Sequence, residues 1–363
     1  MSRSDRRTIL VAMSGGVDSS VAAALLVKAG HRVIGATMKT FCYSDTPGPS
    51  RTCCGLEGIM DARAVCDTLG IPHYVFDLEE EFTRAVIDDF VTEYAAGRTP
   101  NPCVRCNSNT KLPDLLRKGR MLGADAVATG HYARISPPEE PGGAPRIRRG
   151  LDARKDQSYF LWGVPKAMLP YLEFPVGELT KSEVRAMARE LGLATADKPE
   201  SQEICFVPTN DYTDFLAQRL GSDHPALSPG ALVTTTGEVI GQHGGYARYT
   251  VGQRKGLGGG HRRPLYVLGV RPATNEVVVG SNDELYRADV TLADLNWLDT
   301  PPVPGERVKV QVRYRARAVD ARVISIGPDR VQLELDEPER AITPGQSGAV
   351  YRDDILVGGG RIR

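Results

Sequence analysis

The chain has 363 residues, with 45 Lys+Arg and 45 Asp+Glu, so its formal net charge is zero. The length predicts two or three domains, and 41% hydrophobic with 25% charged residues is typical of a globular rather than a disordered protein. Zero net charge excludes a protein that binds nucleic acid through a large overall positive field, although it permits a local basic face.

The sequence also bears on location and thiol chemistry. It contains no stretch of about 18 apolar residues, and its first ten residues lack the apolar core of a secretory signal. We therefore expect no transmembrane helix and a cytoplasmic protein. The cysteines are odd in number, which favours reduced thiols over a disulfide framework. They lie at positions 42, 53, 54, 66, 103, 106 and 205.

Short apolar runs alternate with helical patterns in the first part of the chain. Strands are predicted at 8–13, 32–38, 73–78 and 125–129, and helices at 21–29, 58–69 and 81–96. This alternation predicts an α/β domain with a parallel sheet, in which ligands bind at the carboxyl ends of the strands. Residues 41–58 and 97–109 read as long loops, and 136–149 as an exposed excursion.

The sequence pattern changes near residue 215: beyond it, many glycines and short strand-like runs replace the helical patterns. Strands are predicted at 266–270, 276–280, 308–315, 321–326, 331–335 and 349–352. We expect a catalytic domain at 1–215, a small central domain at 216–285 and a β-barrel at 286–363.

The strongest chemical signal is SGGVDSS at 14–20, between a predicted strand and a helix. Gly15 and Gly16 allow backbone N–H groups to approach an anion, and the helix N-terminus adds partial positive charge. Asp18 could hold Mg²⁺ against bound phosphates. The lysine of a Walker A loop is missing, which makes transfer of a γ-phosphate less expected. The alternative is a glycine turn that merely caps a helix.

Two cysteine motifs follow. NPCVRCN at 101–107 has a C-x-x-C spacing, which fits a redox pair, half of a metal site, or one reactive thiol. SQEICF at 201–206 contains Cys205, which by itself is more typical of a small buried hydrophobic residue than of a nucleophile. Cys66 lies in a helical pattern and is expected in the core.

Basic residues cluster late in the chain. All charged residues from 248 to 271 are basic, and between 307 and 322 five arginines and one lysine face a single acid. Tyrosines interleave with them, as suits phosphate contacts and base stacking, and we expect Arg313, Arg315 and Arg317 on one strand face. The alternative is an ordinary solvated sheet face.

Taken together and in order, these motifs resemble the bacterial tRNA-specific 2-thiouridylase family of the ATP pyrophosphatase superfamily. The matching segments are AMSGGVDSS (12–20), GRTPNPCVRCN (97–107), ATGHYAR (128–134), KDQSYFL (155–161), SQEICFV (201–207), YTVGQRKGL (249–257), VRYR (312–315) and TPGQS (343–347).

The resemblance implies adenylation of the tRNA wobble uridine (position 34) at O2, followed by sulfur transfer from a persulfide on Cys205. Cys106 would be the partner nucleophile, closing a transient disulfide with Cys205, and a separate persulfide donor protein would supply the sulfur. ATP with Mg²⁺ would bind at Ala12, Met13, Ser14, Gly15, Gly16, Val17, Asp18, Ser19, Met38 and Gly130.

The resemblance also implies residues that contact tRNA or its target base. These are Asn101, Pro102, Cys103, His131, Lys155, Asp156, Gln157, Arg313, Tyr314 and Gln346. From the sequence alone, His131 could equally be a structural imidazole and the 155–158 segment a solvated helix start. Many family members carry Asp where this chain has Cys103, and three thiols at 103, 106 and 205 could instead hold an iron–sulfur cluster.

Two other functions fit parts of the pattern. Another adenylating enzyme of the superfamily would need neither Cys106 nor Cys205, and would not need the basic β domains. A nucleotide-sensing module without turnover would need neither Asp18 nor paired cysteines.

Overall fold

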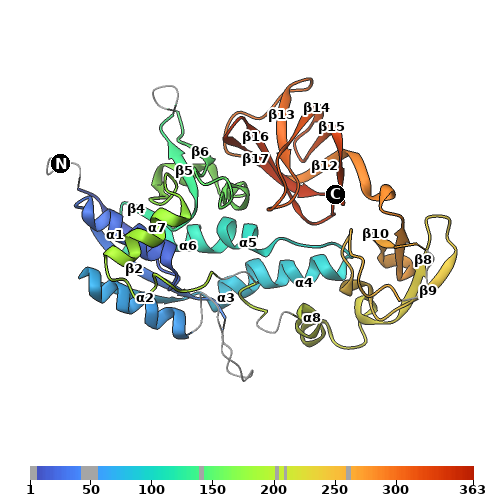
Figure 1. Cartoon of the computed structure of the whole chain (residues 1–363), viewed down its shortest axis with the longest axis horizontal. Coiled ribbons are helices and arrows are strands. Elements are labelled where there is room, and N and C mark those ends of the chain that lie inside the picture. Colours follow the sequence, from blue (N-terminus) through green and yellow to red (C-terminus); the bar gives the residue numbers. More distant parts are fainter. Residues whose placement is uncertain (1–5, 42–55, 139–142, 201–203, 208–210, 259–262) are drawn as a thin grey trace.

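A computed structural model describes residues 6–41, 56–138, 143–200, 204–207, 211–258 and 263–363. Three sheets and their helices build the molecule (Figure 1). Within these ranges no helix has the length and apolarity needed to span a bilayer.

The first sheet is parallel throughout and has the order β3-β2-β1-β4-β7. The central strand, β1, lies between β2 and β4, which were both predicted as strands. Because the three strands are parallel, their carboxyl ends lie at the same edge of the sheet. This confirms the expected α/β class. The strands are β1 (Thr8–Ala12), β2 (Arg32–Lys39), β3 (His73–Asp77), β4 (Ala126–Thr129) and β7 (Leu172–Glu173).

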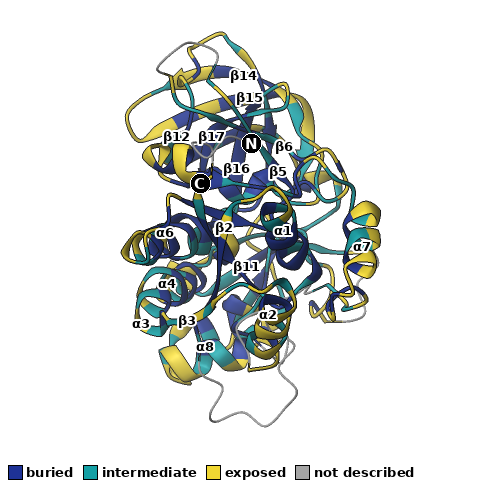
Figure 2. Ribbon diagram, turned by 90° about the vertical axis from the view of Figure 1, so that its left-hand side faces the viewer, coloured by how far each residue is buried: buried dark blue, intermediate teal, exposed yellow. Residues whose placement is uncertain are grey.

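Helices cover both faces because successive residues of β1 point to opposite sides. Ile9 and Val11 pack with α1 (Val17–Lys28), α2 (Leu56–Leu69) and α7 (Lys181–Glu190). Leu10 and Ala12 pack with α6 (Leu112–Met121) on the other face. Figure 2 shows the resulting pattern, with buried strands between helices whose outer faces are exposed.

Two long helical segments are interrupted by π-helical turns, which often mark functional sites. One runs through α3 (Glu79–Phe82), the π turn Thr83–Ile87 and α4 (Asp88–Ala95). The other runs through α5 (Pro102–Arg105), the π turn Cys106–Lys111 and α6. The 97–109 segment, read as a loop from the sequence, is therefore partly helical.

The second sheet has the order β10-β11-β8-β9. Its inner side chains join α4 and α8 (Tyr212–Leu220) in one hydrophobic cluster, so this unit packs directly on the first domain. The strands are β8 (Gly230–Val233), β9 (Val239–His243), β10 (Tyr266–Arg271) and β11 (Glu276–Gly280).

The third sheet closes into the expected barrel, because β12 pairs with both β15 and β17. The barrel strands are β12 (Tyr286–Trp297), β13 (Arg307–Gln311), β14 (Val319–Ile326), β15 (Arg330–Arg340), β16 (Ser347–Arg352) and β17 (Ile355–Ile362).

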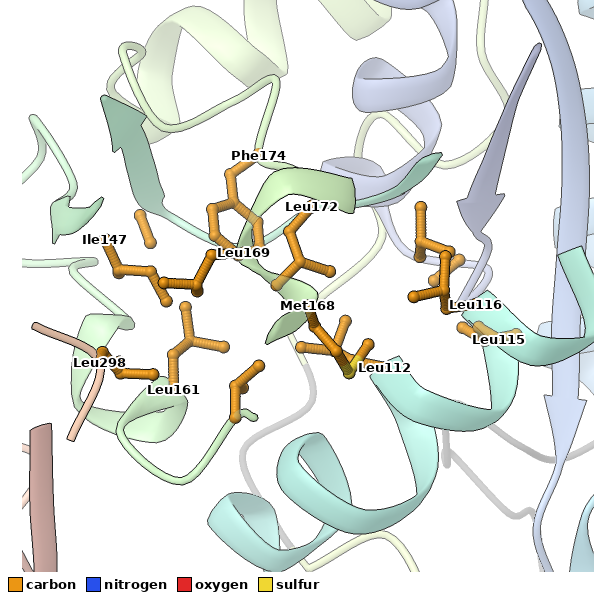
Figure 3. Close-up of a cluster of buried hydrophobic side chains, with 14 of the residues drawn as sticks. Leu112, Leu115, Leu116, Ile147, Leu161, Met168, Leu169, Leu172, Phe174 and Leu298 are labelled. Atoms are coloured by element: carbon orange, nitrogen blue, oxygen red, sulfur yellow. The ribbon is translucent and has the colours of Figure 1, made fainter. Parts of the chain in front are cut away.

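The reading of 136–149 as an exposed excursion is wrong for residues 146–149, and residues 139–142 lie outside the described part of the chain. A hairpin of β5 (Ala133–Ser136) and β6 (Arg146–Arg149) leaves the first domain, and β6 pairs with β17 outside the barrel. Buried Ile147 packs beside Leu161 and Leu298 between the two domains (Figure 3). The pairing partner lies about 200 residues away in sequence, so local composition could not reveal it.

Candidate active site

The glycine loop lies between β1 and α1, as the sequence predicts. Gly15 has φ +68°, and a Cβ there would lie 2.4 Å from the carbonyl oxygen of Gly58. The Ser19 hydroxyl donates to the Gly16 carbonyl at 3.0 Å and accepts the Ser14 amide at 3.2 Å. These bonds hold the loop at the N-terminus of α1, where the first helical amides have no partner inside the helix.

The remaining residues expected at the nucleotide lie beside this loop. Met38 is buried near the end of β2, next to β1 in the sheet. Gly130 follows β4, and a Cβ there would lie 2.6 Å from the Ser19 nitrogen and 2.7 Å from the Asp18 carbonyl carbon. Only glycine therefore allows β4 to end this close to α1. A phosphate group suits this loop because two glycines, Gly15 and Gly130, let backbone segments pack closely around it. The N-terminus of α1 adds unpaired amides and partial positive charge.

Asp18 is held by two side chains that the sequence analysis did not assign. The Tyr132 hydroxyl donates to Asp18 Oδ1 at 2.7 Å, and Lys181 Nζ lies 2.6 and 2.7 Å from its two oxygens. Lys181 also approaches Glu200 at 3.3 Å, and Lys155 donates to Glu200 at 2.7 Å. Burial raises the pKa of Glu200, but these two lysines outweigh it and hold that pKa below its usual value.

The C-x-x-C segment forms the start of the second interrupted helix. Asn101 caps α5, its side-chain oxygen accepting the Val104 amide at 3.3 Å. Cys103 is exposed, whereas Cys106 is half-buried at the beginning of the π turn.

Cys205 is half-buried, and both Cys106 and Cys205 pack against the hydrophobic cluster around Phe90 and Phe206. The fold thus brings two thiols 99 residues apart in sequence to one cluster. Cys66 is buried as expected, and desolvation, with Asp67, raises its pKa to about 12. Cys42, Cys53 and Cys54 lie outside the described residues.

The three thiols at 103, 106 and 205 do not fit an iron–sulfur cluster. In the described parts of the chain, no three His, Cys, Asp or Glu side chains are arranged to hold a metal ion. Cys103 is exposed on α5. Burial, above all, raises the pKa of Tyr314, with smaller contributions from Asp156, Glu200 and the Cys103 thiol.

Aromatic side chains from the first domain and the barrel meet beside this cysteine segment. Phe160 packs on Tyr314 with ring centroids 4.3 Å apart, and the Asn107 amide donates to the Phe160 carbonyl. Tyr159 is fully buried and donates to the Ser347 carbonyl. Tyr314 and the 101–107 segment, both expected to contact tRNA, therefore lie close together in the structure.

The expectation that Arg313, Arg315 and Arg317 share a strand face is wrong. Strand β13 ends at Gln311, whose amide donates to the carbonyls of Arg313 and Tyr314 and closes a turn. Arg313 pairs with Glu339 at 2.8 Å. The Gln311 amide occupies the two backbone carbonyls that a longer strand would use for pairing with its neighbours. An alternating pattern of polar and apolar residues does not reveal such a hydrogen bond.

The basic region is also less positive than its sequence suggests. Arg307, Lys309 and Arg271 pair with Asp336, Asp320 and Glu276. Arg315 and Arg317 remain exposed and form no ion pair with any described residue. Acids from neighbouring strands thus reduce the local charge.

Two neighbouring residues expected at tRNA, Asp156 and Gln157, have their side chains engaged inside the protein. Buried Asp156 accepts hydrogen bonds from Arg149, the Gly150 amide and Ser158. Gln157 accepts the Tyr132 amide at 3.0 Å. The Ser158 amide also donates to Asp156 at 3.1 Å, which supports the alternative of a helix start at 155–158, but Asp156 and Ser158 are buried rather than solvated.

Buried His131 bonds Thr129 through Nδ1 at 2.6 Å, and its ring packs edge-on against Phe174. Burial, with Lys111, holds its pKa well below the usual value, so the imidazole is neutral. These surroundings support a structural role for His131.

Gln346 joins the barrel to the cysteine segment. Its side-chain amide donates to the carbonyls of Thr99 and Pro100 at 3.0 and 3.1 Å, and the Thr99 amide donates to Pro344 at 2.9 Å. The TPGQS motif thus holds the backbone that leads into Asn101.

A buried ionic network reinforces the same junction. Arg361 of β17 pairs with Asp89 at 2.8 Å and with Glu93 at 2.6 Å on α4. Arg105, one residue before Cys106, also donates to Asp89, and Arg98 donates to Glu93. The barrel therefore braces both ends of the 98–105 segment.

Family models match nearly the whole chain. Residues 7–209 match the family described as tRNA methyl transferase HUP domain, 213–281 its PRC-barrel domain, and 287–362 the aminomethyltransferase beta-barrel domain. A solved 4-thiouridine synthetase in complex with RNA and ATP covers 60% of this chain and 51% of its own, with 16% identity and a TM-score of 0.35.

Curated relatives are much more similar. The tRNA-specific 2-thiouridylase MnmA of Carboxydothermus hydrogenoformans is 49% identical over 98% of both chains. That of Geotalea uraniireducens is 47% identical over 98% of this chain and 95% of its own. With identity of this extent over nearly the full length, the chain belongs to the MnmA family of tRNA-specific 2-thiouridylases.

Proposed function

We propose that the protein catalyses ATP-dependent 2-thiolation of the wobble uridine of tRNA. The observation that carries the proposal is the placement of Cys106 and Cys205 against one cluster in a domain that also bears the glycine loop. The names of the full-length relatives support the same reaction. We also propose that the chain divides near residues 215 and 285, and that it works in the cytoplasm.

The glycine loop is proposed to bind the phosphates of ATP, with Ala12, Met38 and Gly130 around the nucleotide. Loop amides and the α1 N-terminus would stabilise charge developing on pyrophosphate as uridine O2 attacks the α-phosphate. Mg²⁺ held near Asp18 would supply further charge neutralisation. The adenylate makes C2 reactive, because AMP leaves far more readily than a urea-like oxygen.

Cys205 is proposed to carry a persulfide received from a donor protein. Its terminal sulfur attacks C2, and the Cys106 thiolate then attacks the Cys205 sulfur. The S–S bond of the persulfide breaks, a Cys106–Cys205 disulfide forms, the transferred sulfur stays on C2, and AMP leaves. The two cysteines supply the two electrons that reduce the sulfur, so a thiol reductant must then reset the enzyme.

The RNA is proposed to lie across the junction of the first domain and the barrel. Asn101–Cys103 and Lys155 are proposed to contact it. The Phe160–Tyr314 pair lies beside the cysteine segment through the Asn107 hydrogen bond to Phe160, and a flipped-out uridine is proposed to stack there. Exposed Arg315 and Arg317 are proposed to contact phosphates.

The test is a reconstituted reaction with purified protein, tRNA, ATP, Mg²⁺ and a persulfide donor, followed by nucleoside mass spectrometry. Wild-type protein and a Cys66→Ala control, which removes a buried thiol packed between β1, α1 and α2, should form 2-thiouridine, whereas Cys205→Ser and Cys106→Ser should form almost none. Unchanged product with Cys205→Ser would refute the carrier role. Adenylation without any thiolation in the wild type would favour another adenylating enzyme.

A further inference from the structure

The glycine loop lacks its own lysine, but the fold places one over it. Lys181 lies 163 residues after Asp18, yet its Nζ is 2.6 and 2.7 Å from both Asp18 oxygens. Asp18 lies in the first turn of α1, whose N-terminal amides follow the glycines. The ammonium group is therefore at the mouth of the phosphate loop.

The position of Lys181 is electrostatically demanding. Its side chain is only 12% exposed, and it is the first residue of α7, where the helix dipole disfavours a cation. The N-terminus of α1 adds a second positive pole nearby. Asp18 and Glu200 balance the charge of Lys181 through ion pairs at 2.6 and 3.3 Å. An anion entering the loop would meet two helix N-termini and one ammonium group.

The backbone around Lys181 is anchored independently of its side chain. Thr180 and Glu183 form a capping box, and the Lys181 amide donates to Asp152 at 3.1 Å. The flexible four-carbon stem can therefore re-aim the ammonium group while the helix stays in place. Tyr132 would remain on Asp18 throughout, through its 2.7 Å hydrogen bond.

The geometry points to Lys181 as a phosphate-binding residue for ATP, in the role that a lysine within the loop plays in Walker A proteins. This inference rests on the proposed function. When ATP binds, Lys181 exchanges Asp18 for a phosphate oxygen and leaves Asp18 available to a cation. The other lysines near the site are directed elsewhere, Lys155 to Glu200 and Lys198 to Asp61.

The experiment compares Lys181→Met and Lys181→Arg with the wild type and with Arg189→Ala. Arg189 lies on the same helix, but it is exposed and pairs with Asp197. Equilibrium dialysis measures binding of radiolabelled ATP with Mg²⁺ and, separately, of adenosine. We expect Lys181→Met to weaken ATP binding roughly 10- to 100-fold, as for loss of a charged hydrogen bond, with adenosine binding unchanged. Arg189→Ala should match the wild type for both ligands.

Unchanged ATP binding, or an equal loss for ATP and adenosine, would overturn the inference, the second because it indicates a structural role. If Lys181→Met does not fold, Lys181→Arg decides, with a loss of about threefold or more expected for ATP alone because the planar guanidinium does not reproduce the ammonium geometry. Formation of 2-thiouridine by the wild type is assayed in parallel. Its absence would refute the proposed function and leave the binding result intact.

Discussion

Substituting Gln346→Glu tests whether this residue acts on the protein or on RNA. The amide donates to the carbonyls of Thr99 and Pro100 at 3.0 and 3.1 Å. A carboxylate of the same shape removes both donors and faces two carbonyl oxygens. Each lost bond costs about 1 kcal/mol, and leaving the carbonyls unpaired adds a comparable amount, so we expect a total near 3 kcal/mol.

The assay is thermal unfolding of the RNA-free protein, in which a loss of this size lowers the Tm by several degrees. The penalty should shrink at low pH. The new carboxyl has a higher pKa in the folded state than in the unfolded state, so the folded variant is favoured when it is protonated. The difference from wild type should therefore be largest near pH 8 and smallest near pH 4.5.

Gln332→Glu is the matched control, because Gln332 is an exposed barrel residue whose side chain accepts a hydrogen bond from Ser325. It should unfold like the wild type. Equal Tm values for Gln346→Glu and the wild type would refute the positioning role and leave a direct tRNA contact as the function of Gln346.

Three further predictions follow from the geometry of the site. Gly130→Ala puts a Cβ 2.6 Å from the Ser19 nitrogen, so we expect at least tenfold weaker ATP binding by equilibrium dialysis, and wild-type affinity would contradict the tight approach. Arg361→Met uncovers the Asp89 and Glu93 carboxylates and should cost about 3 kcal/mol, measured by urea unfolding, with a loss below 0.5 kcal/mol contradicting it. Neutral His131 has a lowered pKa, so its contribution is complete above about pH 6.5 and is lost as pH falls. His131→Gln should flatten the pH dependence of Tm below pH 6.5, and an unchanged profile would show that the buried imidazole does not titrate on unfolding.

Local patterns were sufficient for the first domain and the general position of its loop. The runs at 8–13 and 32–38 alternate with helical segments, and that alternation is compatible with few folds other than a parallel sheet. The loop SGGVDSS carries its own evidence, because Gly15 must adopt a positive φ and Gly16 must precede a helix. Cys66 could be placed in the core for a similar reason, since its neighbours repeat with helical spacing.

The sequence by itself therefore determined the fold class, the glycine loop and the cysteine motifs of this protein. Tertiary structure alone decided which polar groups meet: the ion pairs of Lys181 with Asp18 and of Arg361 with Asp89, and the hydrogen bond of Gln346 with Thr99. Each of these pairs joins segments more than 100 residues apart, so no local period or motif encodes it. At Arg313 the cause is local instead: a hydrogen bond from the Gln311 side chain to the Arg313 carbonyl ends the strand and overrides the alternating pattern. Contacts between distant segments depend on how whole elements pack, and that packing is settled only when the complete chain has folded.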